Sequence, residues 1–275
     1  MSHAIDAAEV PSPRPAPTPS PRRITLLTAA VAVTAVILHI QLHEYAHAVT
    51  AVLLVGSSTV HGAMADHPPA SDADLALIAM AGPVFSVVLG LLAWAASRPM
   101  PSGYARALLT WIGLSSIQGA FGYLMIALVA PVGDTAVAFE AWGLGIVWSI
   151  ASFVVGVAGM FLCAYLLARE IGRTFETPAP FRSASVWTWL VATAAILAIY
   201  GGVAVLAGLD GELFAWTIIG PSTALVFAPM ATIFWKAVPY RRRPWSVGAT
   251  PVVVAGLVVA VAIVAVHAIV GVELG

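Results

Sequence analysis

The sequence predicts an all-α, polytopic membrane protein with about seven transmembrane helices. Hydrophobic residues make up 60% of the 275 positions and charged residues only 9%, whereas about a quarter of the residues in a soluble domain are charged. So few charges could not cover the water-exposed surface of a soluble protein of this length. The lipid bilayer is therefore the expected surrounding of the chain.

The second observation is a series of apolar runs, each long enough to cross a bilayer, which takes roughly 20 residues. The predicted spans are 24–56, 75–97, 104–130, 141–167, 186–208, 213–235 and 249–271. The first run is long, so its helix is expected to tilt, protrude or break. Spans five and six are separated by a few residues around Asp210 and Glu212, which predicts a tight hairpin or a broken pair. Pro83, Pro221 and Pro229 are expected to kink or break their helices.

The third observation is the placement of the basic residues. With seven spans, all twelve lysines and arginines fall on the N-terminal side of the membrane. They are Arg14, Arg22, Arg23, Arg98, Arg106, Arg169, Arg173, Arg182, Lys236, Arg241, Arg242 and Arg243. Loops rich in lysine and arginine stay in the cytoplasm. We therefore predict a multi-pass protein of the cell membrane with a cytoplasmic N-terminus and an external C-terminus.

Three regions follow from composition. Residues 1–23 contain six prolines that alternate with small or polar residues, which predicts a disordered, extended leader rather than a signal peptide. Residues 24–140 hold the first three spans and the motifs described below. Residues 141–275 are predicted to form additional transmembrane helices. The net charge of −1 gives no basic excess for binding nucleic acid.

The first span contains the motif His43-Glu44-Tyr45-Ala46-His47, which has the pattern H-E-x-x-H. On a helix, His43 and His47 lie one turn apart on one face, and two imidazoles at that spacing can bind one Zn²⁺ ion. Glu44 then lies beside the metal and can take a proton from its water. The alternative is a polar helix face without metal. Ionisable residues in a membrane span are costly and usually functional, so we favour the zinc interpretation.

Catalytic zinc usually has three protein ligands and one water, so a third ligand is needed. Asp134 follows Pro131-Val132-Gly133 at the outer end of the third span. Because spans one and three run in the same direction, Asp134 can reach the level of the histidines. Alone, Asp134 could equally be a solvated turn residue or a helix cap. Beside a metal motif that lacks a third ligand, the ligand interpretation is favoured.

The other histidines have simpler interpretations. His39 lies one turn before His43; it is either a further metal-site residue or, as we prefer, a histidine bonded to a neighbouring helix. His61 and His67, in the outer loop after the first span, are expected to be solvated. His267 is alone in the last span and is expected to pack against another helix.

With these residues, the sequence resembles the site-2 protease family of intramembrane zinc metalloproteases (peptidase family M50). Three segments carry the resemblance in order: His43–His47, Ala81-Gly82-Pro83 in the next helix, and Pro131–Asp134. The resemblance covers about residues 30–140. It implies that His43, His47 and Asp134 hold zinc, that Glu44 activates water, and that the helix around Pro83 lines the substrate path.

The chain departs from the family pattern at two positions. Ser86 stands where the family often has asparagine, and Thr135 replaces the glycine after the aspartate. The family also often acts nearer the cytosolic face, whereas the charge pattern places this motif toward the outer face.

The sequence therefore predicts a zinc-dependent endopeptidase that cleaves membrane-anchored protein substrates, with Glu44 as general base. Two alternatives belong to other classes. One is a non-proteolytic zinc-binding protein that transports or handles metal, although such a protein needs no general base. The other is a scaffold whose Pro-rich leader recruits a partner.

Overall fold

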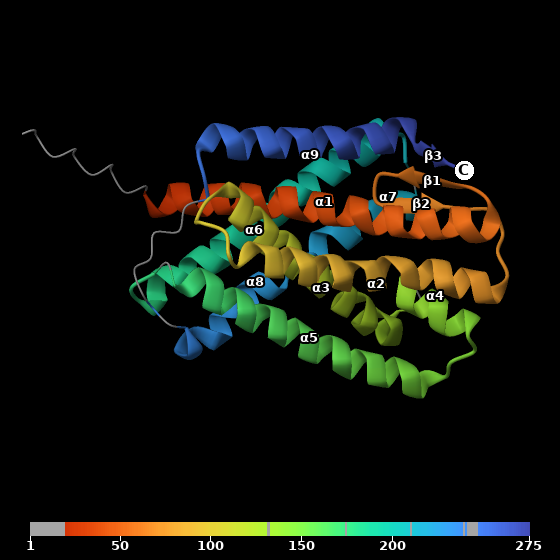
Figure 1. Cartoon of the computed structure of the whole chain (residues 1–275), viewed down its shortest axis with the longest axis horizontal. Coiled ribbons are helices and arrows are strands. Elements are labelled where there is room, and N and C mark those ends of the chain that lie inside the picture. The colour runs from red at the N-terminus through yellow and green to blue at the C-terminus, as the bar shows by residue number, and fades with distance from the viewer. Residues whose placement is uncertain (1–19, 131–132, 174, 210, 239, 241–246) are drawn as a thin grey trace, which may run out of the picture.

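The computed structural model describes residues 20–130, 133–173, 175–209, 211–238, 240 and 247–275 (Figure 1). Within these residues, seven helical stretches are long and apolar enough to cross a membrane. The prediction of an all-α, polytopic membrane protein is therefore confirmed. Most of the predicted leader, Asp210 and residues 241–243 lie outside the described residues.

The long helices lie side by side along one common direction (Figure 1). They are α1 (Pro21–Val55), α2 (Asp72–Ser97), α3 (Tyr104–Val129), α5 (Ile146–Gly172), α6 (Pro178–Leu206) and α9 (Thr250–Val270). The remaining helical segments are α4 (Asp134–Ala141), α7 (Gly211–Thr223), α8 (Phe227–Met230) and the 3₁₀ helix η1 (Ala231–Ala237). Three short strands complete the fold: β1 (Ser58–His61), β2 (Met64–Asp66) and β3 (Val272–Leu274).

Helix α1 is the central element of the bundle. It starts where Ser20 accepts a hydrogen bond from the Arg23 amide, with Pro21 in the first turn, so residues 21–23 of the predicted leader are helical. It continues unbroken for 35 residues to Val55 and is followed by Gly56, whose φ of 95° favours glycine. Its middle is buried among α2, α3, α6 and α9. Of the three outcomes expected for this long span, breaking is excluded.

Helices α2 and α3 pack closely because glycines face each other. A Cβ atom built on Gly90 would lie 2.8 Å from the carbonyl oxygen of Gly113, and one on Gly113 would lie 2.8 Å from Cβ of Trp94. Small residues at such positions let membrane helices approach at backbone distance, which maximises their van der Waals contact. This close contact fixes the position of α2 relative to α3.

The largest differences from the predicted span boundaries are in the fourth and fifth long helices. The fourth long helix begins at Ile146 rather than at residue 141, because α4 is a separate helix that ends in a turn at Gly143. Gly143 has a φ of 66°, a conformation that favours glycine. The fifth begins at Pro178 rather than at 186, and its first turns bury Phe181 completely. Hydropathy therefore runs the fourth span into the apolar α4 segment and misses the more polar first turns of the fifth helix.

The sixth predicted span is broken. Its residues form α7, α8 and η1 in succession, with Pro221 inside α7 and Pro229 inside α8. Proline lacks the amide hydrogen that continues a helix. In contrast, α2 continues through Pro83. The broken span brings Pro221 to the cavity described below.

A small antiparallel sheet lies at the end of the bundle that holds Val55 and the C-terminus (Figure 1). The strand order is β2-β1-β3, with Val60 of β1 paired with Ala65 on one side and Val272 on the other. The predicted outer loop is thus partly a hairpin, and the last residues of the chain extend it.

At one end of the bundle, arginines from three segments surround a single carboxylate. At the end where α1 starts, the buried Glu170 of α5 forms ion pairs with Arg106 at 2.5 Å, Arg98 at 3.3 Å and Arg173 at 3.7 Å. These arginines come from the α2–α3 connection, α3 and the end of α5. One carboxylate therefore joins connections that the sequence places on the same side of the membrane.

The glycine contact between α2 and α3 can be tested with a matched pair of substitutions. Gly113→Ala should lower the thermal stability of the detergent-solubilised protein, by about 1–3 kcal/mol in unfolding free energy, because the methyl group overlaps Trp94. Gly202→Ala in α6 is the control, since nothing lies within 4 Å of its Cβ position. Equal melting temperatures for the two variants would contradict the close α2–α3 contact.

Candidate metal centre

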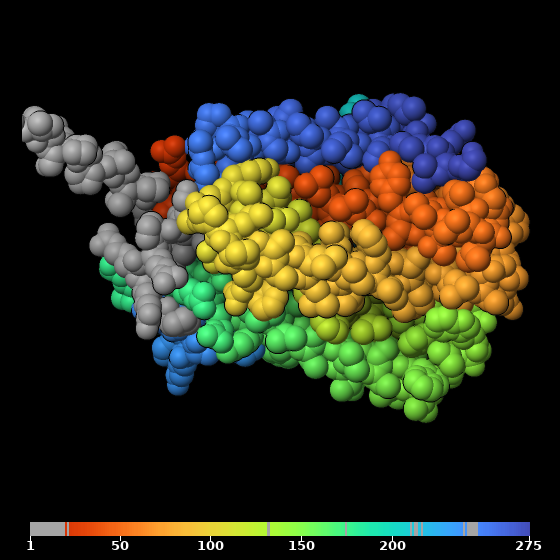
Figure 2. Space-filling model, viewed as in Figure 1, coloured from red at the N-terminus to blue at the C-terminus, as the bar shows by residue number. Residues whose placement is uncertain are grey.

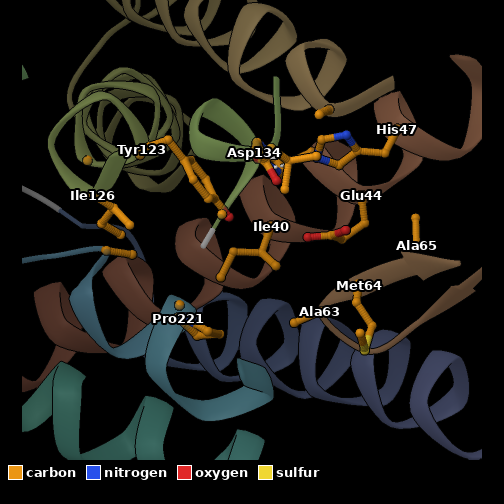
Figure 3. Close-up of a pocket in the computed structure, with 18 of the residues that line it drawn as sticks. Ile40, Glu44, His47, Ala63, Met64, Ala65, Tyr123, Ile126, Asp134 and Pro221 are labelled. Atoms are coloured by element: carbon orange, nitrogen blue, oxygen red, sulfur yellow. Dashed lines mark hydrogen bonds and ion pairs between the residues drawn. The ribbon is translucent and has the colours of Figure 1, made fainter. Parts of the chain in front are cut away.

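The H-E-x-x-H motif lies in the buried part of α1. His43, Glu44 and His47 are 3%, 7% and 7% exposed. Their helical spacing places the two imidazoles on one face and Glu44 about 100° around from His43. All three line one cavity of about 570 Å³ (Figure 3).

Helix α4 brings Asp134 to the two histidines. Gly133, with a φ of 84°, turns the chain so that α4 starts at Asp134. One Asp134 carboxylate oxygen lies 2.9 Å from Nε2 of His43 and 3.3 Å from Nε2 of His47. The three potential ligand atoms lie within 4.8 Å of one another, and this buried group could hold a metal ion. The structure thus brings together the three residues that the sequence predicted as ligands, and Asp134 does not cap the fourth long helix.

Neighbouring groups orient both imidazoles. Nδ1 of His47 lies 2.7 Å from the backbone oxygen of Ile78. A carbonyl oxygen can only accept, so Nδ1 of His47 carries the proton and, in the neutral ring, Nε2 presents its lone pair to Asp134. Nδ1 of His43 lies 2.9 Å from Oγ of Ser86. Bonds of this kind fix ring orientation and tautomer in histidine metal sites.

The assignment of the His47 proton to Nδ1 also tests whether the three residues fit a metal ion. Nε2 of His47 lies 3.1 Å from Nε2 of His43 and 3.3 Å from the Asp134 oxygen. Electron-rich atoms so close together need a positive charge among them, either a proton or a metal ion. Two imidazole nitrogens and one carboxylate oxygen form a donor set suited to zinc. The residues therefore fit the ion that the sequence predicted.

The electrostatics of Asp134 agree with this fit. Burial alone would raise the pKa of its carboxyl group. The two nearby histidines, His47 foremost, outweigh burial and hold the Asp134 pKa well below its ordinary value. The carboxylate therefore stays charged, as a metal ligand must.

The position before Pro83 in α2 has room only for glycine, Gly82. A Cβ atom at Gly82 would lie 2.3 Å from Nε2 of His47 and 2.6 Å from Nε2 of His43. Any side chain here would enter the space between the two histidines. On the other side, the Tyr123 ring of α3 stacks on His43, with ring centroids 5.2 Å apart and an angle of 9° between the planes.

The Glu44 carboxylate extends into the cavity, on the side of the hairpin residues Ala63, Met64 and Ala65 (Figure 3). It is not part of the three-residue group that could hold the ion. Its place beside that group is consistent with the prediction that Glu44 is not a ligand, and its role as a base stays a prediction.

The remaining histidines have distinct environments. His39 bonds across to Ser86 of α2 at 3.3 Å, as we preferred from the sequence. His61 is half-exposed and lies 3.8 Å from Asp66, whereas His67 lines the cavity rather than being only solvated. His267 contacts α1, as a helix-packing role requires. The preference for a solvated His67 was therefore wrong, and Tyr123 was not foreseen as a cavity residue, because both positions depend on contacts between distant segments.

Comparisons of the chain with protein-family models, with curated proteins and with solved structures found no match. Fold and site together define a polytopic α-helical membrane protein with a buried His43–His47–Asp134 group that could hold a metal ion.

The contact at Gly82 predicts a specific loss of metal. Gly82→Ala should abolish metal binding because its methyl group occupies the space between the two Nε2 atoms. The matched control is Gly122→Ala, which also lies at the cavity but meets only Gln118 at 3.6 Å. Metal per chain, measured by inductively coupled plasma mass spectrometry on both purified variants, checks the prediction. Full metal content in Gly82→Ala would disprove this site.

Proposed function

We propose that this protein is an intramembrane zinc metalloprotease that hydrolyses peptide bonds of membrane-anchored proteins. The observation that carries the proposal is the convergence of His43, His47 and Asp134 in one buried cavity, with the Glu44 carboxylate beside them. These are the donor atoms and the base that zinc-assisted hydrolysis requires, and they come from segments far apart in the sequence.

Zinc is the metal we propose for this donor set, which combines borderline nitrogen ligands with one carboxylate. When bound, it would lower the pKa of a water molecule and polarise the scissile carbonyl group. His43, His47 and Asp134 would hold it through Nε2, Nε2 and a carboxylate oxygen. Ile78 and Ser86 keep the two imidazoles oriented for that task.

Glu44 would move the proton. As a general base its carboxylate takes a proton from the attacking water, and as a general acid it then gives this proton to the leaving amine. The position of Glu44 on the same helix turn as the two histidines, but on an adjacent face, suits this role. A polypeptide must reach Glu44 in an unwound form, because the peptide bonds of an intact helix are hidden from attack.

The cavity walls suit an apolar segment of such a substrate. Ile40 of α1, Ile78 of α2, Ile126 of α3 and Pro221 of the broken sixth span line it. Side chains of a transmembrane substrate are mostly apolar, so a cavity with this lining can bury them. The helix around Pro83 contributes to the wall, which supports its proposed place along the substrate path.

Replacing the proposed base should separate catalysis from binding. Glu44→Gln keeps shape and volume but cannot take a proton, so it should retain zinc and lose cleavage by about 10²–10⁴-fold. Membrane proteomes of cells carrying either form would be compared for single-span proteins that accumulate uncut. His43→Ala, which should lose zinc as well, is the control.

Equal fragment patterns from wild type and Glu44→Gln would exclude the protease. If neither form produced fragments while His43→Ala still disturbed the cell, a role in metal handling would replace it. The scaffold alternative depends on the Pro-rich leader, most of which lies outside the described residues.

We further propose that the N-terminus is cytoplasmic and that the metal centre lies toward the outer half of the cell membrane. Topology reporters fused near Arg106 and Arg173 should therefore be read in the cytoplasm, because they lie at the basic end of the bundle. A reporter at Asp72 should be read outside. A cytoplasmic signal at Asp72 would invert the orientation and place the centre in the cytosolic half.

A further inference from the structure

The last helix carries one ionisable side chain within its apolar sequence. His267 stands near the end of α9 (Thr250–Val270) and is 9% exposed. Most of α9 otherwise faces outward, and it packs mainly along α1 (Figure 2). An imidazole buried in a membrane helix is costly without a partner, so its contacts indicate what α9 does.

His267 belongs to a hydrogen-bonded chain whose direction is fixed at one end. The chain runs from Tyr45 through His267 and Gln41 to the backbone oxygen of Gly62. Because the Gly62 oxygen can only accept, the Gln41 amide nitrogen donates to it and the Gln41 oxygen is left to accept from Nδ1 of His267. In the neutral imidazole, Nε2 then accepts from the Tyr45 hydroxyl, 3.1 Å away.

The chain ends at the turn of the β1–β2 hairpin. Gly62 is the first turn residue after β1 and has a φ of 54°. A Cβ atom at Gly62 would lie 3.4 Å from Cβ of Ala268, so the turn also packs directly on α9. The strand that follows α9, β3, pairs with β1, with Thr59 opposite Glu273. The hairpin is thus attached to the C-terminal segment at its turn and along one strand.

The same hairpin forms a wall of the cavity. Ala63 of the turn and Met64 and Ala65 of β2 line the cavity beside Glu44 (Figure 3). These side chains are apolar and uncharged, so this wall suits an apolar side chain of a bound polypeptide. The contact surface next to the proposed base is therefore held in place from α9, more than 200 residues away along the chain and on another face of α1.

We propose that α9 and β3 act as a brace that positions this hairpin wall against a bound apolar segment, with His267 and Gln41 as positioning residues. This proposal rests on the proposed function only in identifying the bound apolar segment as part of a polypeptide substrate. Attachment of the hairpin to α9 is a separate property and can be measured without any cleavage.

The first measurement follows the hairpin itself. A spin label at Asp66→Cys, a position that is 64% exposed at the end of β2, reports hairpin mobility by electron paramagnetic resonance in the zinc-loaded full chain. The buried Cys163 is replaced by alanine in every variant. His267→Leu removes the donor and should increase label mobility. His267→Asn restores an N–H donor and should recover most of the wild-type spectrum.

Two further variants complete the comparison. Val266→Ala changes the neighbouring, outward-facing residue of α9, 54% exposed, and should leave the label unchanged. Gln41→Leu should mobilise the label as His267→Leu does, and the double variant should add little, because both substitutions break the same chain.

The second measurement is kinetic and uses a purified single-span substrate found in the membrane proteome comparison. His267→Leu should raise KM by roughly 2- to 10-fold, the equivalent of one hydrogen bond, with kcat and zinc content unchanged. His267→Asn should restore KM. A merely destabilised protein would instead lose zinc and kcat together.

Unchanged label mobility in His267→Leu and Gln41→Leu would overturn the brace, whatever the proteolytic activity. Increased mobility with an unchanged KM would overturn the positioning of the substrate by the hairpin. If no form cleaved any protein, the proposed function would fail, and the label spectra alone would still decide whether α9 holds the hairpin.

Discussion

The structure depends on the placement of one carboxylate, that of Asp134, against two imidazoles inside an apolar helical bundle. A buried carboxylate is unfavourable unless a positive charge and hydrogen bonds compensate it. Nε2 of His43 is in hydrogen-bond contact with it at 2.9 Å, and Nε2 of His47 lies 3.3 Å away. Two glycines make this contact possible. Gly133 turns α4 toward the histidines, and Gly82 has no side chain that would enter the space between them.

The same constraint accounts for the arrangement of the helices around α1. A helix that carries His43, Glu44 and His47 through a membrane has to shield them from lipid, so it lies in the middle of the bundle and not at its edge. Close packing of α2 on α3 through Gly90 and Gly113 fixes the groups that orient the imidazoles. At the basic end, Glu170 and its arginines hold the connections together without touching the cavity.

The C-terminal half of the chain is more than a set of added membrane spans. Its broken sixth span places Pro221 at the cavity, and its last helix is linked through His267 and Gln41 to the hairpin that forms another part of the wall. Residues before the predicted division at 140 carry the ligand atoms and most of the cavity wall, and residues after it complete that wall and hold the hairpin. Both sets pack against α1 as parts of one bundle.

The sequence by itself determined the features that depend on neighbouring residues. Hydropathy over some twenty residues located the spans, because burial in lipid acts on every residue of a run. The spacing of His43 and His47 placed both rings on one helix face, because helical geometry is local. The partnership with Asp134 could be predicted only because the third ligand had to lie at the same membrane level.

Tertiary structure decided most of the contacts that join distant segments. The pairing of β3 with β1 and the bond from His267 to Gln41 connect segments that have no local pattern in common. The closeness of Gly82 to both histidines is likewise set by how α2 crosses α1. Such contacts are selected by packing and by the need of each buried polar group for a partner, and these conditions exist only once the helices have assembled.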